Sequence, residues 1–308
     1  MKKLRYSLLL LAVVVGITAC DKIDNPYEKV VNYDIDTTLY PGAWQDYLAN
    51  EYPTFAPNPN TNVNVLIEDY TGHLCSNCPN AATKAHQIHQ NYPTRVFIAS
   101  IHAGPGGKVG FQQTNTSGPY TTDHTNSDGI LYGETFENGY NFIGNPQGTV
   151  NRKIVNGKMF DFLGTWESRA QDIMTANDLK VNIQSVFNYY SQTNGGYLHV
   201  EVEKMKNEAI EMNAVVYVIQ DSLVDWQLMP DNSDNEFYIH RDKHLGSIDN
   251  RPWGQKVFDA ATPVGEKKIF DYSYKLPTDI DKENLHFLIY VYDVDTYEIL
   301  QVIRQDIN

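Results

Sequence analysis

Apolar residues form two short runs near the start of the chain, and both runs predict buried strands. The first run, residues 63–67, is rich in β-branched side chains and is followed by a turn at Gly72. The second, residues 95–101, has the same character. Residues 80–91 between them have the composition of a helix, which Pro93 stops. The pattern predicts a strand–helix–strand unit with parallel strands in a sheet covered on both faces.

The pattern changes after residue 178 to repeated short strands with turns between them. Leu198, Val200 and Val202 alternate with residues that face the other way, as in a strand with one buried face. Six segments are predicted strands, and several of them alternate in this way: residues 179–189, 197–204, 213–220, 266–274, 285–294 and 299–304. Short strands at this spacing predict an all-β immunoglobulin-like sandwich.

The segment between these two regions carries weaker signals. Residues 104–129 are rich in Gly, Thr, Asn and Ser, which predicts a long loop above the strand ends, placed to act as a lid or recognition surface. Helices are expected over residues 130–142 and 165–176, and Asn156-Gly157 predicts a hairpin. Pro146 lies between a glycine-containing turn and a strand, where a cis peptide bond is tolerated.

Composition and charge exclude several classes of protein. The 308 residues are 42% hydrophobic and carry a net charge of −14, as expected for a folded domain with an acidic exterior. A nucleic-acid partner is not expected, because a phosphate backbone requires a basic face. The chain has no G-x-S-x-G motif of serine hydrolases, and Gly106-Gly107 lacks the lysine, serine and spacing of a phosphate-binding loop.

The first twenty residues have the form of a targeting segment. Three basic residues precede a short apolar run that is too short to span a bilayer, and Ile17-Thr18-Ala19-Cys20 follows. We expect residues 1–19 to be a lipoprotein signal peptide and Cys20 to be lipidated, so that the protein lies on the membrane without crossing it. The alternative is an ordinary secretory peptide with an incidental cysteine. Residues 20–60 are polar and rich in proline, as in a tether that is partly docked by residues 40–52.

The two remaining cysteines, Cys75 and Cys78, lie where the first strand passes into the helix. A disulfide between them would close too small a loop to add much stability by the chain-entropy argument. A redox pair, an inert disulfide and a metal site therefore remain open. His73 and His102 would belong to such a copper or zinc site.

Other histidines are assigned no chemistry from the sequence. His86 and His89 lie on one helical face, and no third metal ligand is nearby in the sequence. We expect them to lie on a solvated face of the helix. His240 and His244 are expected to cap or pack. The sequence thus gives no metal-ligand set.

A family resemblance rests on residues 65–72, on Cys75-Ser76-Asn77-Cys78-Pro79, and on Gly144-Asn145-Pro146 ahead of Asn151-Arg152. Tyr238-Ile239-His240-Arg241 extends it. These motifs resemble the Omp28 family of Bacteroidetes outer membrane lipoproteins. The resemblance implies a thioredoxin-like α/β domain, which we place at residues 61–177, followed by the β-sandwich domain at residues 178–308.

The resemblance also implies roles for individual residues. In a thioredoxin-like fold Cys75 is the exposed nucleophile at a helix N-terminus, where its pKa is lowered, and Cys78 is the buried resolving thiol. Asp69 is either a buried acid that assists the resolving thiol or a solvated carboxylate at the strand end. Pro146 is the cis-proline that lies against the C-x-x-C and offers backbone groups to an extended substrate. The alternative is an ordinary trans proline in a turn. The expected catalytic set is Cys75, Cys78, Asp69 and Pro146.

Three functions follow as hypotheses. The first is an outer membrane lipoprotein that exchanges disulfides with a protein or peptide thiol substrate, without a cofactor or a bound metal. The second is a non-catalytic surface binding protein or adhesin that keeps a structural disulfide. The third, weaker hypothesis is a metal-handling protein. The sequence leaves open whether the protein faces the periplasm or the cell surface.

Overall fold

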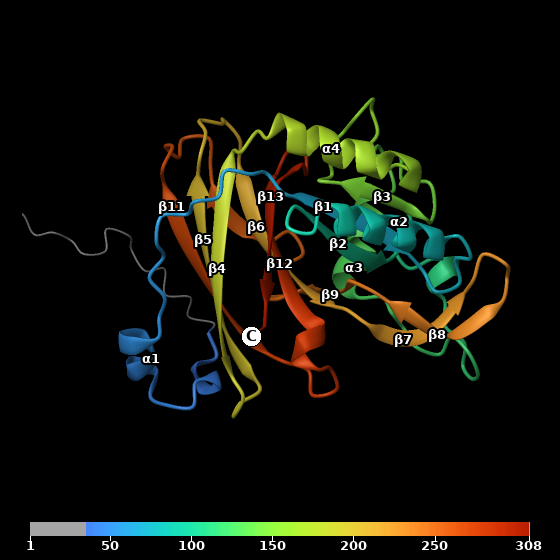
Figure 1. The fold of residues 1–308 in the computed structure, drawn as a ribbon, viewed down its shortest axis with the longest axis horizontal. Coiled ribbons are helices and arrows are strands. Elements are labelled where there is room, and N and C mark those ends of the chain that lie inside the picture. The colour runs from blue at the N-terminus through green and yellow to red at the C-terminus, as the bar shows by residue number, and fades with distance from the viewer. Residues whose placement is uncertain (1–34, 308) are drawn as a thin grey trace, which may run out of the picture.

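The computed structural model describes residues 35–307 (Figure 1). The expected signal peptide and Cys20 lie outside the described residues. Within them the chain is mostly β-structure arranged in several sheets. The α-helices of this part of the chain are α1 (Trp44–Asn50), α2 (Cys78–Asn91), α3 (Ser127–Phe136) and α4 (Trp166–Ala176).

The expected strand–helix–strand unit is present. Strand β1 (Val65–Thr71) pairs in parallel with β2 (Val96–His102), and α2 connects them. Strand β3 (Gln147–Val150) pairs antiparallel with the other edge of β1. Every residue of β1 and β2 is buried because helices cover one face and aromatic side chains the other. Pro79 lies in the first turn of α2, where its missing N–H has no helical partner to lose.

Strands from before and after residue 178 share one sheet. Its order is β13-β12-β6-β9-β2-β1-β3, where β6 is Met212–Gln220, β9 is Lys243–Ser247, β12 is Leu285–Asp293 and β13 is Ile299–Asp306. Strand β9 joins the two regions: it runs antiparallel to β6 and meets β2 in parallel at Ser100 and Lys243. We place the domain boundary in the connection after α4. The two regions on either side of it therefore contribute strands to one continuous sheet.

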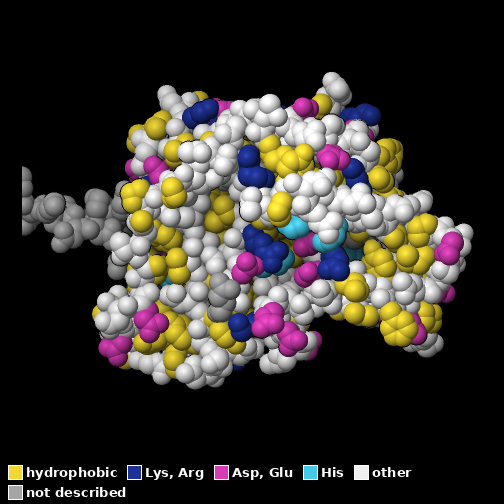
Figure 2. All heavy atoms as spheres, viewed as in Figure 1, with side chains coloured by type: hydrophobic (Ala, Val, Ile, Leu, Met, Phe, Trp, Pro, Cys, Tyr) yellow, Lys and Arg dark blue, Asp and Glu magenta, His cyan; other side chains and the backbone are white. Residues whose placement is uncertain are grey.

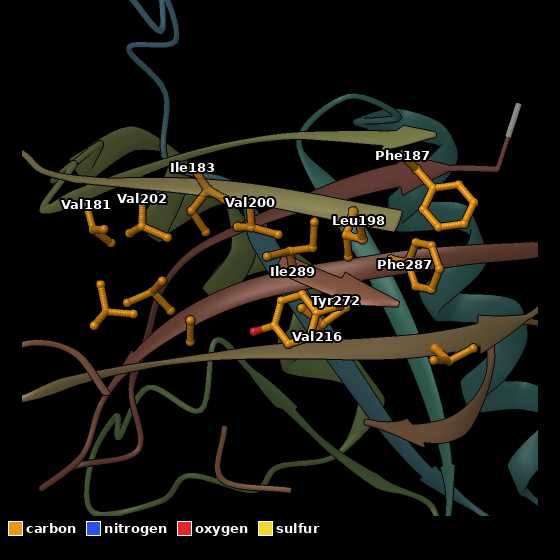
Figure 3. Close-up of a cluster of buried hydrophobic side chains, with 14 of the residues drawn as sticks. Val181, Ile183, Phe187, Leu198, Val200, Val202, Val216, Tyr272, Phe287 and Ile289 are labelled. Carbon is orange, nitrogen blue, oxygen red and sulfur yellow. The ribbon is translucent and has the colours of Figure 1, made fainter. Parts of the chain in front are cut away.

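The strands after residue 178 also build a sandwich. Strands β4 (Val181–Tyr190), β5 (Gly195–Lys204) and β11 (Lys267–Lys275) form a second sheet that faces β6, β12 and β13 across an apolar core. Figure 3 shows side chains of both sheets meeting in that core, among them Phe187 and Phe287. The six strands expected here are confirmed, with ends that coincide or differ by one or two residues.

Sequence patterns gave no indication of a hairpin that reaches back over the first part of the chain. Its strands are β7 (Leu223–Leu228) and β8 (Asp234–His240), and it lies at the end of the molecule near the start of α2 (Figure 1). The short strand β10 (Gln255–Phe258) was not expected either. The hairpin was missed because Asp, Asn and Trp residues interrupt the apolar alternation of its strands.

The segment before β1 is docked on the sandwich, as expected for residues 40–52. Tyr47 of α1 is fully buried, and its ring lies 4.8 Å from that of Tyr197. The Tyr47 hydroxyl contacts His199, whose Nδ1 is 2.7 Å from Asp271 Oδ1. This polar contact holds α1 against the outer face of β5 and β11.

Candidate functional site

Cys75 and Cys78 form a disulfide at the start of α2, with their Cα atoms 5.4 Å apart. Both are buried, with exposed fractions of 2% for Cys75 and 1% for Cys78. The expectation that Cys75 is an exposed nucleophile is therefore wrong for this conformation. Two segments cover the disulfide and account for the burial of Cys75. The sequence did not place either of them there.

The first covering segment is strand β7. The side-chain amide of Gln227 donates a hydrogen bond to the carbonyl oxygen of Cys75 over 3.1 Å, and Gln227 is itself buried. The backbone N–H of Leu228 donates to the carbonyl oxygen of His73 over 2.9 Å. Strand β7 is thus bound to the loop between β1 and α2 on both sides of Leu74.

The second covering segment is the insertion of residues 104–126. The N–H of Leu74 donates to the carbonyl oxygen of Phe111 over 3.1 Å, and the side chain of Gln112 donates to the carbonyl oxygen of Thr71 over 2.7 Å. A Cβ atom at Gly72 would lie 2.5 Å from the Phe111 oxygen, so glycine is needed for this approach. The insertion lies above the strand ends, as its composition led us to expect.

Asp69 is a buried acid on β1. Its exposed fraction is 1%, and neither carboxylate oxygen has a hydrogen-bond partner within the described structure. Burial raises the pKa of Asp69 to about 7. The alternative of a solvated carboxylate is therefore wrong. Its neighbour Glu68 is also buried, because the sheet is covered on both faces.

The Asn145–Pro146 peptide bond is cis, as expected. Pro146 immediately precedes β3, where Gln147 lies opposite Tyr70 of β1. Asn145 is held near the strand ends because its side chain donates to the carbonyl oxygen of Ala103 over 2.9 Å. These contacts place Pro146 beside the end of β1, and a role for it in substrate binding remains a prediction.

Four buried histidines gather near the ends of β1 and β2, and one of them, His73, lies two residues before Cys75. We call His73, His102, His124 and His240 the histidine cluster. The ring centroids are 5.1 Å apart for His102 and His124, 4.9 Å for His124 and His240, 5.7 Å for His102 and His240, and 5.4 Å for His73 and His124. None of the four is more than 5% exposed. The cluster lies where β1 and β2 end and where β7, β8 and the insertion meet them.

The rings of the cluster differ in their hydrogen bonds. His73 Nε2 lies 2.7 Å from the carbonyl oxygen of Gln113, and His240 Nε2 lies 3.4 Å from that of Trp226. His124 Nε2 is 3.3 Å from Asp225 Oδ2. Both ring nitrogens of His102 are buried without a hydrogen-bond partner within the described structure.

Burial makes charged imidazole unfavourable in this cluster. It lowers the pKa of His124 to about 3 and that of His240 to about 4, and it lowers the pKa of His102 well below the ordinary value. These three rings are therefore neutral at pH 7. Burial also lowers the pKa of Lys243, whose Nζ lies 3.4 Å from His124 Nδ1.

The sequence pointed to only part of this site. It singled out His73 and His102, whereas His124 and His240 were missed because the insertion and the hairpin bring them in from distant positions. Within residues 35–307, no three His, Cys, Asp or Glu side chains are already posed around a metal position. Over the same residues, no helix has the length and apolar character needed to cross a bilayer.

The outer surface of the hairpin is apolar. Phe237 is 73% exposed, Val224 54% and Ile239 43%. A hollow of about 480 Å³ lies between this surface and α2, lined in part by Phe237, Tyr238 and His86. Figure 2 shows hydrophobic side chains gathered at this end of the molecule. The cover of the disulfide thus presents an apolar face to solvent.

Comparisons with known proteins identify both a family and a fold. The family described as outer membrane protein Omp28 matches residues 133–308. The structure of HBP35 of Porphyromonas gingivalis superposes with a TM-score of 0.58 at 14% identity, covering 80% of this chain and 76% of that one. This likeness concerns the fold alone.

Two further solved structures are similar over different shares of the chain. A domain of the outer membrane lipoprotein Omp28 from Porphyromonas gingivalis is 20% identical, with a TM-score of 0.28, and covers 42% of this chain and 90% of that one. Protein AGR_C_4864 from Agrobacterium tumefaciens is 14% identical, with a TM-score of 0.47, and covers 80% and 96%. No curated protein sequence gives a significant match.

Proposed function

Because the chain belongs to the Omp28 family of outer membrane lipoproteins, we propose that it is a non-catalytic binding protein of that membrane with a closed structural disulfide. The burial of Cys75 under Gln227 carries this proposal. Disulfide exchange requires a thiolate to reach one of the two sulfur atoms. Neither sulfur can be reached while β7 covers the loop, and the exposed apolar face of the hairpin offers a surface for a partner protein.

The proposal includes a thioredoxin-like fold for residues 61–177 and an immunoglobulin-like sandwich for residues 178–308. The sheet order β2-β1-β3, with β1 parallel to β2 and antiparallel to β3, supports the first part. The two facing sheets around one core support the second. The proposal also includes lipid attachment at Cys20.

A second candidate is thiol–disulfide exchange with a protein or peptide thiol, and Asp69 is the observation that favours it. A buried carboxyl group with a pKa of about 7 can accept or release a proton near neutral pH, as a group that assists a resolving thiol must. This activity requires the hairpin and the insertion to move away from Cys75. The catalytic roles of Cys75, Cys78, Asp69 and Pro146 belong to this candidate.

An insulin-reduction assay with dithiothreitol separates the two candidates. The protein and its Cys75→Ser/Cys78→Ser variant are compared at equal concentration, and we expect the same rate from both. A rate for the unaltered protein well above that of the variant would reject the non-catalytic proposal and establish the exchange activity. Circular dichroism of both proteins would verify that the variant is folded.

A further inference from the structure

We propose that the histidine cluster binds one divalent transition-metal ion through His102, His124 and His240, with His73 placed to supply a fourth nitrogen. This metal site does not depend on the proposed function, because its ligands are imidazoles and it requires neither Cys75 nor Cys78. Borderline metals such as Zn²⁺, Cu²⁺ and Ni²⁺ prefer imidazole nitrogen, whereas Mg²⁺ and Ca²⁺ prefer oxygen.

The spacing of the rings fits a shared ion. A zinc–nitrogen bond of about 2.0–2.1 Å places an imidazole centroid roughly 3 Å from the metal, so two rings of a tetrahedral site lie roughly 5 Å apart. The centroids of His102, His124 and His240 are 4.9 to 5.7 Å apart. His73 lies 5.4 Å from His124. The backbone thus already holds these rings at the separation that one ion requires.

The hydrogen bonds of Nε2 leave the lone pair on Nδ1 in His73, His124 and His240, and among the described residues only that of His124 contacts another group, the Lys243 ammonium. A carbonyl oxygen can only accept, so Nε2 of His73 and of His240 carries the proton, and Nδ1 of the neutral ring carries the lone pair. Asp225 Oδ2 lies 3.3 Å from His124 Nε2 and accepts from it in the same way. A ligand histidine typically donates its second nitrogen to a carbonyl or carboxylate in this manner.

His102 distinguishes the cluster from ordinary packed histidines. Its two ring nitrogens are buried without a hydrogen-bond partner within the described structure, and a buried polar group in that state destabilises the fold. A bound metal would give one of these nitrogens a partner. His102 lies at the end of β2, between His124 of the insertion and His240 of β8, and therefore faces the centre of the cluster.

Binding requires the rings to turn and Lys243 to move. The described side chains are not yet posed around a metal. The ammonium group of Lys243 lies 3.4 Å from Nδ1 of His124, where it takes the lone pair and opposes a second cation. The carboxylate of Asp225 provides the compensating negative charge. Removing the Lys243 ammonium should therefore strengthen metal binding, whereas removing a histidine should weaken it.

The test is Zn²⁺ binding by the whole protein purified in detergent, measured by isothermal titration calorimetry and by metal content after dialysis. We expect one zinc per chain and at least about a tenfold loss of affinity in His102→Ala and in His240→Ala, because removing even an outer-shell partner of a ligand typically costs about 10- to 100-fold. Lys243→Met should bind zinc more tightly. His86→Ala, on the half-exposed face of α2, is the matched control and should bind as the unaltered protein does.

Two results would overturn the proposal. One is unchanged zinc affinity in both His102→Ala and His240→Ala, and the other is loss of binding in His86→Ala instead, which would place the ion on α2. The visible absorption spectrum of the Co²⁺-loaded protein is a second test that needs no variant, because tetrahedral nitrogen coordination gives strong visible absorption. A weak octahedral spectrum would contradict the site even if the histidine variants failed to fold.

Discussion

The side-chain amide of Gln227 reaches the carbonyl oxygen of Cys75 over 3.1 Å, although 152 residues separate them in the chain. This contact joins a hairpin of the second half to the disulfide loop of the first. Strand β7 thereby lies over the start of α2 and covers the disulfide. The same strand contacts the histidine cluster through Asp225 and Trp226.

Gln227→Ala should expose the disulfide more often. The lost hydrogen bond is worth about 0.5–1.5 kcal/mol, so local opening of β7 should become roughly 2- to 12-fold more frequent. We expect the rate of disulfide reduction by dithiothreitol to rise by a similar factor at pH 8. Gln87→Ala, on an exposed position of α2, serves as the control and should leave the rate unchanged. An unchanged rate in Gln227→Ala would show that this contact does not hold the cover in place.

Asp69→Asn should stabilise the protein above neutral pH. Because burial raises the folded pKa of Asp69 to about 7, its ionisation weakens the fold as pH rises from the unfolded value near 4 to about 7. Above pH 7 the full penalty is present, with an upper limit of about 4 kcal/mol. The asparagine variant lacks this penalty.

Urea unfolding at pH 8 and at pH 4 measures the effect. The gain in unfolding free energy of Asp69→Asn over the unaltered protein should be largest at pH 8 and should fall toward pH 4. Asp172→Asn, on the exposed face of α4, is the control for a general charge effect. An equal gain at both pH values would contradict the assignment of the raised pKa to Asp69.

Glu68→Gln should strongly destabilise the junction between the two halves. Arg152 Nη2 lies 2.6 Å from Glu68 Oε1, both residues are fully buried, and the hydroxyl of Tyr217 on β6 is 3.0 Å from the same oxygen. Burial alone would raise the pKa of Glu68, but Arg152 lowers it, so the pair stays charged. Leaving one buried charge unpaired typically costs 3–5 kcal/mol.

Chemical denaturation of Glu68→Gln can be compared with that of Glu167→Gln. Glu167 pairs with Lys84 at a site where both side chains are about 30% exposed, and such pairs contribute little. We expect a much larger loss of unfolding free energy for Glu68→Gln. Similar losses for the two variants would mean that the buried pair contributes no more to stability than an exposed pair.

The local parts of this fold could be predicted from the sequence, and the long-range parts could not. Apolar runs indicated β1 and β2, and short apolar segments, several of them alternating, indicated the six sandwich strands, because both signals depend on near neighbours in the chain. The pairing of β9 between β2 and β6 involves a short strand, Lys-His-Leu-Gly-Ser, with no apolar periodicity. The shared sheet therefore had no local signal.

The candidate functional site likewise has parts with a local sequence signal and parts without one. The C-x-x-C and the turn before α2 are contiguous, and the sequence showed them. The burial of Cys75 depends on Gln227, and the histidine cluster draws His124 and His240 from the insertion and the hairpin. Nothing in the residues around Cys75 indicates these contacts, so the exposed nucleophile that the family resemblance implied is absent from the structure.

The most direct test of a covered disulfide is its rate of reduction in the folded protein relative to the unfolded one. Equal concentrations of dithiothreitol are applied to the native protein and to the protein in denaturant, and free thiols are counted by alkylation and mass spectrometry. Burial of both sulfurs predicts native reduction at least about tenfold slower, because exchange requires access to a sulfur atom. If the native protein were reduced as fast as the protein in denaturant, the disulfide would not be closed, and Cys75 would be an accessible redox thiol.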